Sequence, residues 1–330
     1  MKQKKKSDQH KQAPTRQSNR NKTISKNNEF LAMNKDLIMI RFSNPSHMNL
    51  CFSNAAVSSL LNVPILRKFL SEYNMHIDEN PITEELVFLA KVNNLSEASS
   101  QKIREIVQSR CFQAGQLTKD FCNNHQHDSG EFMQSLLEHF WNENLQLANT
   151  LKEDMFGGVS QDTLSCACGY RVKLAHEDMS EIIPIPTGAE SVQRGVEDFF
   201  CAENIAWKCP ICAKQTVQKM CSIIIEPSTL ILQLMRYKFD YVKDEASKIH
   251  DQILCSPSIL MPSGSTYFLV SVINHIGEDT TSGHYNVMLS NKHSNKYVLL
   301  DDSNISYVAD DYNGKSDVSY IFTYVKDTEI

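Results

Sequence analysis

The chain has 330 residues, 41% of them hydrophobic, which is enough to build one large catalytic domain or two small ones. No run of about 18 apolar residues occurs, so we expect no membrane-spanning helix. The basic start, Met1 to Lys6, is not followed by an apolar stretch, so we also expect no secretory signal. The 10 cysteines are then predicted to stay reduced inside the cell, in the cytoplasm or nucleus, as metal ligands, nucleophiles or core residues.

The net charge of −6 is unevenly distributed along the chain. Residues 1–26 carry nine Lys and Arg residues against Asp8, which gives +8, so the remainder carries −6 − 8 = −14. Residues 1–29 are rich in Lys, Gln, Asn and Ser, and we predict a disordered basic tail, with order beginning near Phe30. Such a tail is a solvated segment, a nuclear address or a nucleic-acid contact. The acidic remainder favours a basic protein partner over nucleic acid.

The first ordered segment leads toward a cysteine. A short apolar run over 37–42 precedes a loop over 43–50. From Cys51 to Val63, apolar and small residues recur at helical spacing, and Pro64 marks the predicted end of that helix.

The rest of the chain changes from helical patterns to strand patterns. Further helices are predicted over 83–92, 99–110 and 128–148. The last begins with Asp128-Ser-Gly-Glu131, which has the form of a capping box with Asp in the cap position. After Met155, short β-type runs are separated by turn residues, over 182–185, 223–225, 230–234, 267–273, 285–289, 297–300 and 320–325. Helices first and mainly antiparallel strands later predict an α+β fold, not alternating βαβ units.

Cys51 lies where a helix is predicted to begin. Unpaired backbone N–H groups and the positive end of the helix dipole favour a thiolate there. The same N–H groups can donate to an oxyanion. A single buried cysteine is, however, most often a packing residue, so a catalytic interpretation requires partners.

Candidate partners lie more than 200 residues later in the sequence. Gly283-His284-Tyr285 begins a predicted strand, and the next predicted strand ends in Asp301 and Asp302. Two adjacent antiparallel strands would place His284 beside one of these carboxylates, which could hold the imidazole tautomer and stabilise its charged form.

Five segments in this order resemble the ubiquitin-specific protease family, over most of residues 43–325. The family's Cys box, Asn-Thr-Cys-Phe/Tyr-x-Asn, is matched by Asn49-Leu-Cys51-Phe-Ser-Asn54. The other matching segments are Gln126-His-Asp128-Ser-Gly-Glu131-Phe132, Pro227-Ser-Thr-Leu-Ile-Leu-Gln-Leu-Met-Arg-Tyr237, His275-Ile-Gly277 with Ser282-Gly-His284-Tyr285, and Leu300-Asp301-Asp302.

This resemblance implies a papain-like catalytic domain over 30–330, with a helical thumb (43–150), β fingers (155–225) and an antiparallel β palm (226–330). It implies a cysteine-type deubiquitinase that cleaves the isopeptide or peptide bond after the C-terminal Gly of ubiquitin. Its partners would be ubiquitin or ubiquitinated proteins, with no membrane partner, and we expect a monomer.

The resemblance also assigns the catalytic roles. Cys51 would attack as a thiolate, and His284 would activate it and then protonate the leaving amine. Asp301, the first of the two aspartates, matches the usual triad position and would orient His284.

The loop before Cys51 departs from the family pattern. The family has Asn five residues before the cysteine, Gly three before and Thr or Ser one before, where this chain has Ser46, Met48 and Leu50. The family's Asn donates to the oxyanion, so Ser46 is a candidate donor here, and Asn44 or Asn49 is a candidate substitute. Losing one such donor costs about 3–4 kcal/mol of transition-state stabilisation. Met48 also lacks the conformational freedom of Gly.

Two cysteine pairs suggest a metal site. Cys209-Pro-Ile-Cys212 has the spacing of half a zinc knuckle, whereas Cys166-Ala-Cys168 has one intervening residue and not two. The pairs occupy the places where the family's fingers often carry zinc, so a structural zinc bound by these four thiolates is predicted. The alternative is a relic in which the thiols only pack.

Three functional interpretations remain open at this point. The first is an active deubiquitinase, or a protease for a ubiquitin-like modifier. The second is a catalytically weak or dead ubiquitin-binding protein, suggested by the altered loop before Cys51. The third is another papain-like or Cys-His-Asp transferase. We interpret His275 as a structural partner near the site, and Trp141 and Trp207 as packing residues.

Overall fold

The computed structural model describes residues 34–73, 80–123, 125–144, 155–178, 182–240, 242–278, 282–291, 296–308 and 314–327. Residues 37–330 form one compact unit, and the described residues 34–36 lie outside it. The predicted basic tail and the predicted start of order near Phe30 lie outside the described residues. The helices and strands of the described residues all belong to the unit 37–330, and together they form the predicted mixed α+β fold.

The helices come mostly in the first half of the chain, as predicted. They are α2 (Cys51–Leu61), α3 (Pro64–Glu72), α4 (Pro81–Ala90), α5 (Gln101–Gln113), α6 (Ser129–Glu143) and α8 (Val192–Phe200). The end of the helix predicted over 128–148 is different, because α6 stops at Glu143, and residues 145–150 are outside the described part. Among the described residues, no helix is long and apolar enough to cross a membrane.

Local chemistry sets several helix starts. Asp128 caps α6, because its Oδ1 accepts a hydrogen bond from the Glu131 N–H at 2.9 Å. Pro64 and Pro81 occupy the first positions of α3 and α4, where the missing N–H of proline removes no helical hydrogen bond. The sequence analysis interpreted Pro64 only as the end of the preceding helix, so it did not predict α3.

The larger sheet has the strand order β16-β15-β14-β13-β18-β8-β5, and β12 pairs with part of β13. Its strands are β5 (Ile182–Ile185), β8 (Thr229–Leu234), β12 (Ser258–Leu260), β13 (Thr266–Ile276), β14 (His284–Asn291), β15 (Lys296–Asp301), β16 (Asn304–Val308) and β18 (Ser319–Lys326). Neighbouring strands are antiparallel except β5 and β8, which are parallel. The chain between β5 and β8 contains α8, β6 and β7, and this long connection allows the two strands to run parallel.

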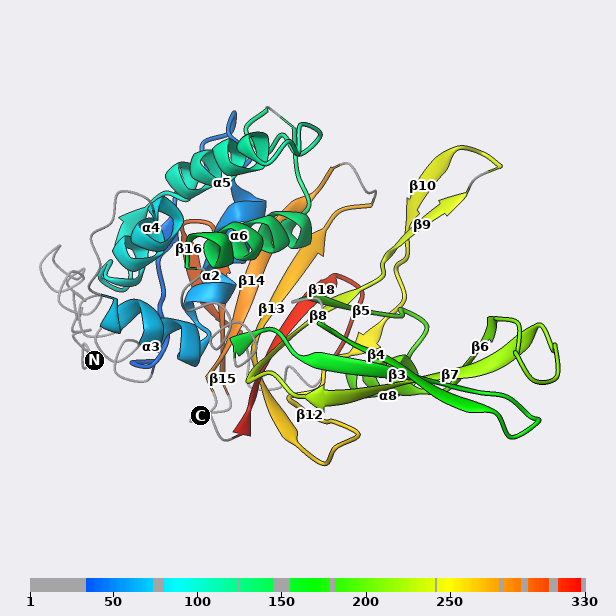
Figure 1. The fold of residues 1–330 in the computed structure, drawn as a ribbon. Helices are drawn as coiled ribbons and strands as arrows, with labels where there is room; N and C mark the ends of the chain where they lie inside the picture. The colour runs from blue at the N-terminus through cyan, green and yellow to red at the C-terminus, as the bar shows by residue number, and fades with distance from the viewer. Residues whose placement is uncertain are drawn as a thin grey trace, which may run out of the picture. The chain divides into compact units, whose positions relative to one another are not determined.

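A second sheet extends away from the helices (Figure 1). Its order is β4-β3-β7-β6, and its strands are β3 (Val159–Ser165), β4 (Arg171–Asp178), β6 (Glu203–Ala206) and β7 (Thr216–Ile225). The short pairs are β1 (Arg41–Phe42) with β2 (Glu97–Ala98), β9 (Tyr237–Asp240) with β10 (Glu245–Lys248), and β11 (Ile253–Leu254) with β17 (Lys315–Ser316). The thumb, fingers and palm boundaries remain predictions.

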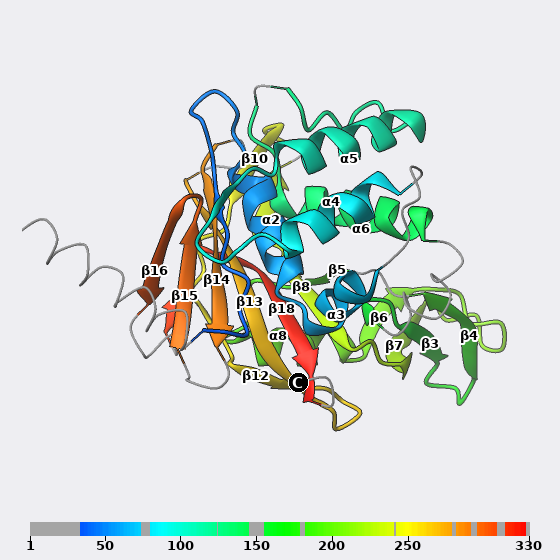
Figure 2. The ribbon, with the colours of Figure 1, turned by 90° about the vertical axis from the view of Figure 1, so that its left-hand side faces the viewer.

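Helix α2 is enclosed between the larger sheet and the other helices (Figure 2). All of its residues are buried, and they include small ones such as Ser59. The Ser59 Oγ lies 2.7 Å from the Ser271 Oγ on β13 and 3.1 Å from the Thr323 Oγ1 on β18. These contacts fix the helix that begins at Cys51 directly on the sheet that carries His284.

The opposite face of the sheet packs against α8. Along β8, Leu230, Leu232 and Leu234 point to this face and belong to a core cluster with Val192 and Val196 of α8. Ile231 between them is also buried, so β8 is covered on both faces. The sheet therefore has two covered faces, and α2 is on the face opposite α8.

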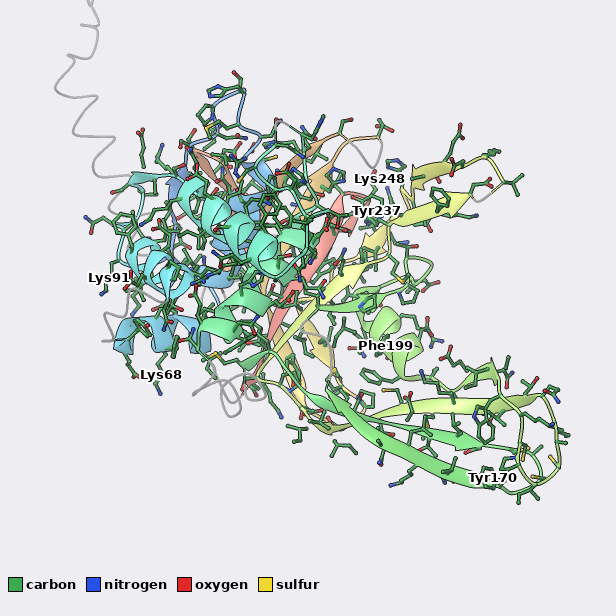
Figure 3. All side chains as sticks on the ribbon, turned by 45° about the horizontal axis from the view of Figure 1, so that its top comes forward. Lys68, Lys91, Tyr170, Phe199, Tyr237 and Lys248 are labelled. Carbon is green, nitrogen blue, oxygen red and sulfur yellow. The ribbon has the colours of Figure 1, made fainter. Side chains whose placement is uncertain are left out.

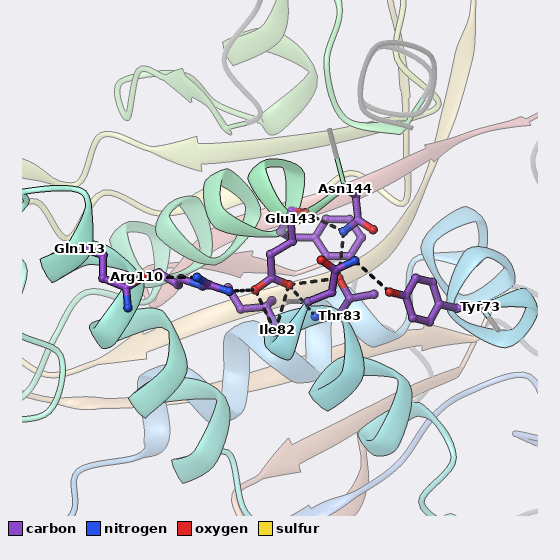
Figure 4. A network of polar contacts seen from close by, with 9 residues as sticks. Tyr73, Ile82, Thr83, Arg110, Gln113, Glu143 and Asn144 are labelled. Atoms are coloured by element: carbon purple, nitrogen blue, oxygen red, sulfur yellow. Dashed lines mark hydrogen bonds and ion pairs between the residues drawn. The ribbon is translucent and has the colours of Figure 1, made fainter. Parts of the chain in front are cut away.

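A polar network joins α4, α5 and α6 (Figure 4). The Glu143 carboxylate, at the end of α6, accepts hydrogen bonds from the N–H groups of Ile82 and Thr83 in the first turn of α4, both at 3.1 Å. Arg110 of α5 pairs with the same carboxylate at 3.3 Å. Burial raises the pKa of Glu143, while these donors and Arg110 oppose that rise. The network satisfies the otherwise unpaired start of α4.

Candidate active site and cysteine cluster

Cys51 is the first residue of α2 and is only 4% exposed. The Asn54 N–H makes the first helical hydrogen bond, to the Leu50 carbonyl at 2.8 Å. The N–H groups of Cys51, Phe52 and Ser53 precede that bond, so they have no acceptor within the helix. The thiol therefore lies beside a set of backbone donors, as the sequence analysis expected.

His284 and Asp301 meet at the neighbouring ends of β14 and β15. These strands are antiparallel neighbours, which is the arrangement predicted from the sequence. The His284 Nε2 lies 2.5 Å from the Asp301 Oδ1. Because Nε2 is used by Asp301, Nδ1 is the ring nitrogen left for the Cys51 thiol.

The surroundings of His284 favour its protonated form. A hydrogen bond with the Cys51 side chain raises the pKa of His284 to about 9, with a further contribution from Asp301, while desolvation opposes the rise. Near neutral pH the imidazole therefore keeps its proton. The structure thus brings together all three residues of the predicted triad: Cys51, His284 and Asp301.

Asp302 makes no described hydrogen bond to His284. It binds instead to two asparagines close to Cys51 in the sequence, Asn44 and Asn54. It occupies the tight turn between β15 and β16 with φ of 51°, a left-handed conformation that Asp tolerates better than most residues. Its Oδ2 accepts from the Asn44 Nδ2 at 2.8 Å, and its Oδ1 accepts from the Asn54 Nδ2 at 2.7 Å. The sequence analysis considered Asp302 only as the alternative carboxylate for His284 and chose Asp301, so it did not predict the bonds from Asp302 to Asn44 and Asn54.

The loop over 43–50 is held by one side chain of its own and by one from α5. The Asn44 Oδ1 accepts from the Leu50 N–H at 2.8 Å, so Asn44 closes the loop on itself. The Arg104 Nη1 donates to the Met48 carbonyl at 2.8 Å. Asn44 is thus occupied in bracing the loop between Leu50 and Asp302.

The structure resolves the conformational concern about Met48. The left-handed residue in this loop is Asn49, with φ of 49°, and not Met48. Asn is among the residues that adopt this conformation most readily. Ser46 lies exposed in a turn over 46–48, and Asn49 is half-buried two residues before Cys51. The oxyanion roles of Ser46 and Asn49 remain predictions.

The start of α6 contacts the strand that carries His284. The Gly283 N–H donates to the Gln126 Oε1 at 2.5 Å, and the Tyr285 hydroxyl donates to the Asp128 Oδ2 at 3.1 Å. Asp128 therefore has a second role besides capping α6. These two contacts hold the residues on both sides of His284.

The four predicted cysteine ligands converge at the second sheet. The Sγ atoms of Cys166, Cys168, Cys209 and Cys212 all lie within 4.8 Å of one another. Cys166 and Cys212 are 3.5 Å apart, and Cys168 and Cys209 are 3.7 Å apart. A tetrahedral zinc with Zn–S bonds of about 2.3 Å requires sulfur atoms about 3.8 Å apart, so the cluster is consistent with a structural zinc site.

Tight turns provide this arrangement. Gly169 and Ala213, which follow the two cysteine pairs, have φ of 91° and 58°. Burial opposes ionisation of Cys209, but the backbone N–H groups of Cys212 and Ile211 lower its pKa to about 7.

Trp207 stacks on Tyr170 at 6.0 Å beside the cluster, and Tyr170 marks the far end of the sheet in Figure 3. Trp141 packs against Phe140, so both tryptophans are packing residues.

Comparisons with known proteins agree with this architecture. A family model described as ubiquitin carboxyl-terminal hydrolase matches residues 40–324. The chain therefore belongs to the ubiquitin carboxyl-terminal hydrolase family, a family of cysteine-type enzymes, and the resemblance seen in the sequence is confirmed.

Among curated proteins, ubiquitin carboxyl-terminal hydrolase 36 of Drosophila mojavensis is 23% identical over 295 residues, which are 79% of this chain and 24% of the relative. The same hydrolase of Drosophila simulans is 23% identical over 288 residues, covering 77% of this chain and 28% of the relative. The chain thus spans about a quarter of the length of these relatives.

A solved structure, the SAGA Ubp8/Sgf11/Sus1/Sgf73 DUB module bound to ubiquitin aldehyde, contains a chain with the same fold. The TM-score is 0.69 at 15% sequence identity, and the match covers 91% of this chain and 75% of the other. This likeness supports the α+β fold class predicted from the sequence.

Proposed function

We propose that this chain is a deubiquitinase that hydrolyses the isopeptide or peptide bond after the C-terminal Gly of ubiquitin. The observation that carries the proposal is the contact of the Cys51 thiol with His284, whose Nε2 lies 2.5 Å from Asp301. The substrate class rests on family membership and on the ubiquitin aldehyde bound to the DUB module of similar fold.

The reaction would begin at the Cys51–His284 pair. Since the pKa of His284 is raised to about 9, a protonated imidazole would lie beside Cys51 at neutral pH, and Cys51 would react in its thiolate form, which is the nucleophilic one. The thiolate would attack the Gly carbonyl carbon, and the carbonyl electrons would move to the oxygen. The N–H groups at the start of α2 and the side chains of Ser46 and Asn49 are the candidate donors to that oxyanion.

Collapse of the tetrahedral intermediate would expel the amine. The leaving lysine nitrogen would take its proton from His284, which leaves a thioester on Cys51 and a neutral imidazole. Water would then lose a proton to His284 as it attacks the thioester carbonyl, and the Cys51 thiolate would leave. Asp301 would hold the ring orientation through both steps.

The four-cysteine cluster would serve structure and not chemistry. A zinc ion held by Cys166, Cys168, Cys209 and Cys212 would fasten the two turns at the far end of the second sheet. Because these cysteines belong to a different sheet from His284 and Asp301, we infer no step of the reaction through the metal.

The test is covalent trapping with ubiquitin that carries a C-terminal electrophile. We expect a mass shift of one ubiquitin, and we expect Cys51→Ala to abolish it. A SUMO probe run in parallel tests the modifier, and labelling by SUMO alone would reassign the substrate to a ubiquitin-like protein. Absence of labelling by either probe, with measurable ubiquitin affinity, would replace the enzyme with a ubiquitin-binding protein.

A further inference from the structure

The residue before the candidate base lies at a constricted point of the chain. β13 ends at Ile276, and β14 begins at His284. A Cβ on Gly277 would lie 2.7 Å from the Ser282 carbonyl oxygen and 2.9 Å from the Gly283 Cα, so the two sides of this connection touch. We call Gly277, Ser282 and Gly283 the neck. The position of the neck determines where His284 enters its strand.

On the β18 side of β13, no strand among the described residues pairs with the end of β13 that leads into the neck. The ladder between β13 and β18 ends at the pair Asn274 and Ser319, with the His275 N–H still donating to the Val318 carbonyl at 2.8 Å. Beyond this pair, the backbone of β13 is held by the Lys248 side chain. Its Nζ donates to the His275 carbonyl at 2.8 Å and to the Gly277 carbonyl at 2.7 Å.

Lys248 is the last residue of the β9–β10 hairpin, and it is 8% exposed. Its partner in the ladder is Tyr237, the first residue of β9. The Tyr237 hydroxyl lies 3.1 Å from the His275 Nδ1. Figure 3 labels both residues where the hairpin leaves the rest of the molecule. The paired residues Tyr237 and Lys248 therefore both contact His275: Lys248 binds its carbonyl, and Tyr237 contacts its ring.

The His275 ring, which Tyr237 and Lys248 hold in place, contacts the two residues that flank His284. A Cβ on Gly283 would overlap the His275 Nε2, so the ring lies directly against Gly283. The same ring stacks on Tyr285 at 4.6 Å. His275 thus contacts the residues immediately before and after His284.

We propose that Lys248 is a positioning residue for His284. It fixes the neck by bridging the His275 and Gly277 carbonyls, and it joins the β9–β10 hairpin to the geometry of the Cys51–His284 pair. The inference rests on the proposed hydrolysis. A merely structural lysine would change stability but would leave the ionisation and reactivity of this pair unchanged in the folded protein.

Lys248→Met tests the proposal because methionine keeps most of the apolar stem and removes the donors. We expect kcat for a fluorogenic ubiquitin substrate to fall about 10–100-fold, with KM unchanged within about twofold, since small displacements of a catalytic group have effects of that size. The alkaline limb of the pH–rate profile should also move below pH 9, because the Cys51 contact that raises the pKa of His284 is weakened. Lys243→Met, an exposed lysine on the same hairpin, is the matched control.

A second reporter needs no ubiquitin. The rate of Cys51 alkylation by iodoacetamide, followed by peptide mass spectrometry against pH, measures the thiolate directly. In Lys248→Met the profile should move to higher pH than in the wild-type protein, because the protonated His284 is held less firmly beside Cys51. Tyr237→Phe, which removes only one hydroxyl, should move it in the same direction by less and provides the test if Lys248→Met does not fold.

The outcomes separate the two proposals. A folded Lys248→Met protein with wild-type kcat and an unshifted alkylation profile would overturn the positioning role. A wild-type protein without ubiquitin turnover would overturn the proposed function, while the alkylation profile would still test the link between Lys248 and His284.

Discussion

The chain places its cysteines in two different settings, and the contrast shows how the surroundings of one kind of side chain suit it to two different roles. Cys51 is a single thiol at a helix start, and its partners lie more than 200 residues away in the sequence. The four cysteines of the second sheet face one another, and each pair comes from one short turn. The distant partners of Cys51 fit the reactive thiol that we propose, whereas the clustered thiols are consistent with a metal site.

Removing the single thiol should have the largest effect. Cys51→Ala is expected to lower ubiquitin-substrate turnover by at least about 10³-fold, because no other group can form the thioester. Steady-state turnover measures the loss. Cys201→Ala, at an exposed cysteine outside both settings, should keep wild-type turnover. Comparable losses of turnover in both variants would contradict the assignment of Cys51 as the nucleophile.

Asp301→Asn should be the next most severe change. We expect kcat to fall about 10²-fold or more, since the carboxylate that orients His284 is lost. The sign of the pH effect follows from the raised pKa of about 9, to which Asp301 contributes. Activity that needs the protonated imidazole is present below pH 9 and lost above it, so the alkaline limb should move to lower pH in the variant. A pH–rate profile with an unmoved limb would remove Asp301 from the triad.

Asp302→Asn separates the two neighbouring carboxylates. This change weakens the hydrogen bonds to Asn44 and Asn54, and each such charge-assisted bond contributes about 1.5–3 kcal/mol. We expect kcat to fall about tenfold through loosening of the loop before Cys51. The alkaline limb of the same pH profile should stay in place. A limb that moves as far as in Asp301→Asn would show that the two acids share one role.

Changes in the cysteine cluster should have the mildest effect on chemistry. Cys209→Ser is expected to reduce the metal content from about one zinc per chain to well below one. KM should rise several-fold with kcat nearly unchanged, because the second sheet is remote in sequence and topology from Cys51. Metal analysis and steady-state kinetics on the same sample check both parts. Wild-type protein without zinc would support packing thiols as the role of the cluster.

The cysteine cluster was predictable because its information is local. Two short spacings identified Cys166, Cys168, Cys209 and Cys212, and the structure brings their sulfur atoms together. The β-runs of the larger sheet were also visible, because strands that are buried on both faces form short, nearly continuous apolar runs between turn residues. Strands β3, β4 and β6 lack such a pattern over most of their length, and the sequence analysis did not predict them.

The site around Cys51 was predictable in its main residues but not in its supports. Motif order pointed to His284 and Asp301, and their strands are adjacent, as expected. The bond from Asp302 to Asn44 spans 258 residues, and the bond from Lys248 to His275 depends on where one ladder ends. Neither follows from spacing or composition, because each depends on the register of strands that only the folded chain defines.

The central claim is that one cysteine among 10 carries the chemistry. The most direct measurement is peptide mapping of the adduct formed with electrophilic ubiquitin at neutral pH. We predict a single modified peptide, with the ubiquitin attached at Cys51 and with Cys166, Cys168, Cys209 and Cys212 unmodified. An adduct on any other cysteine, or one distributed among several, would contradict the account.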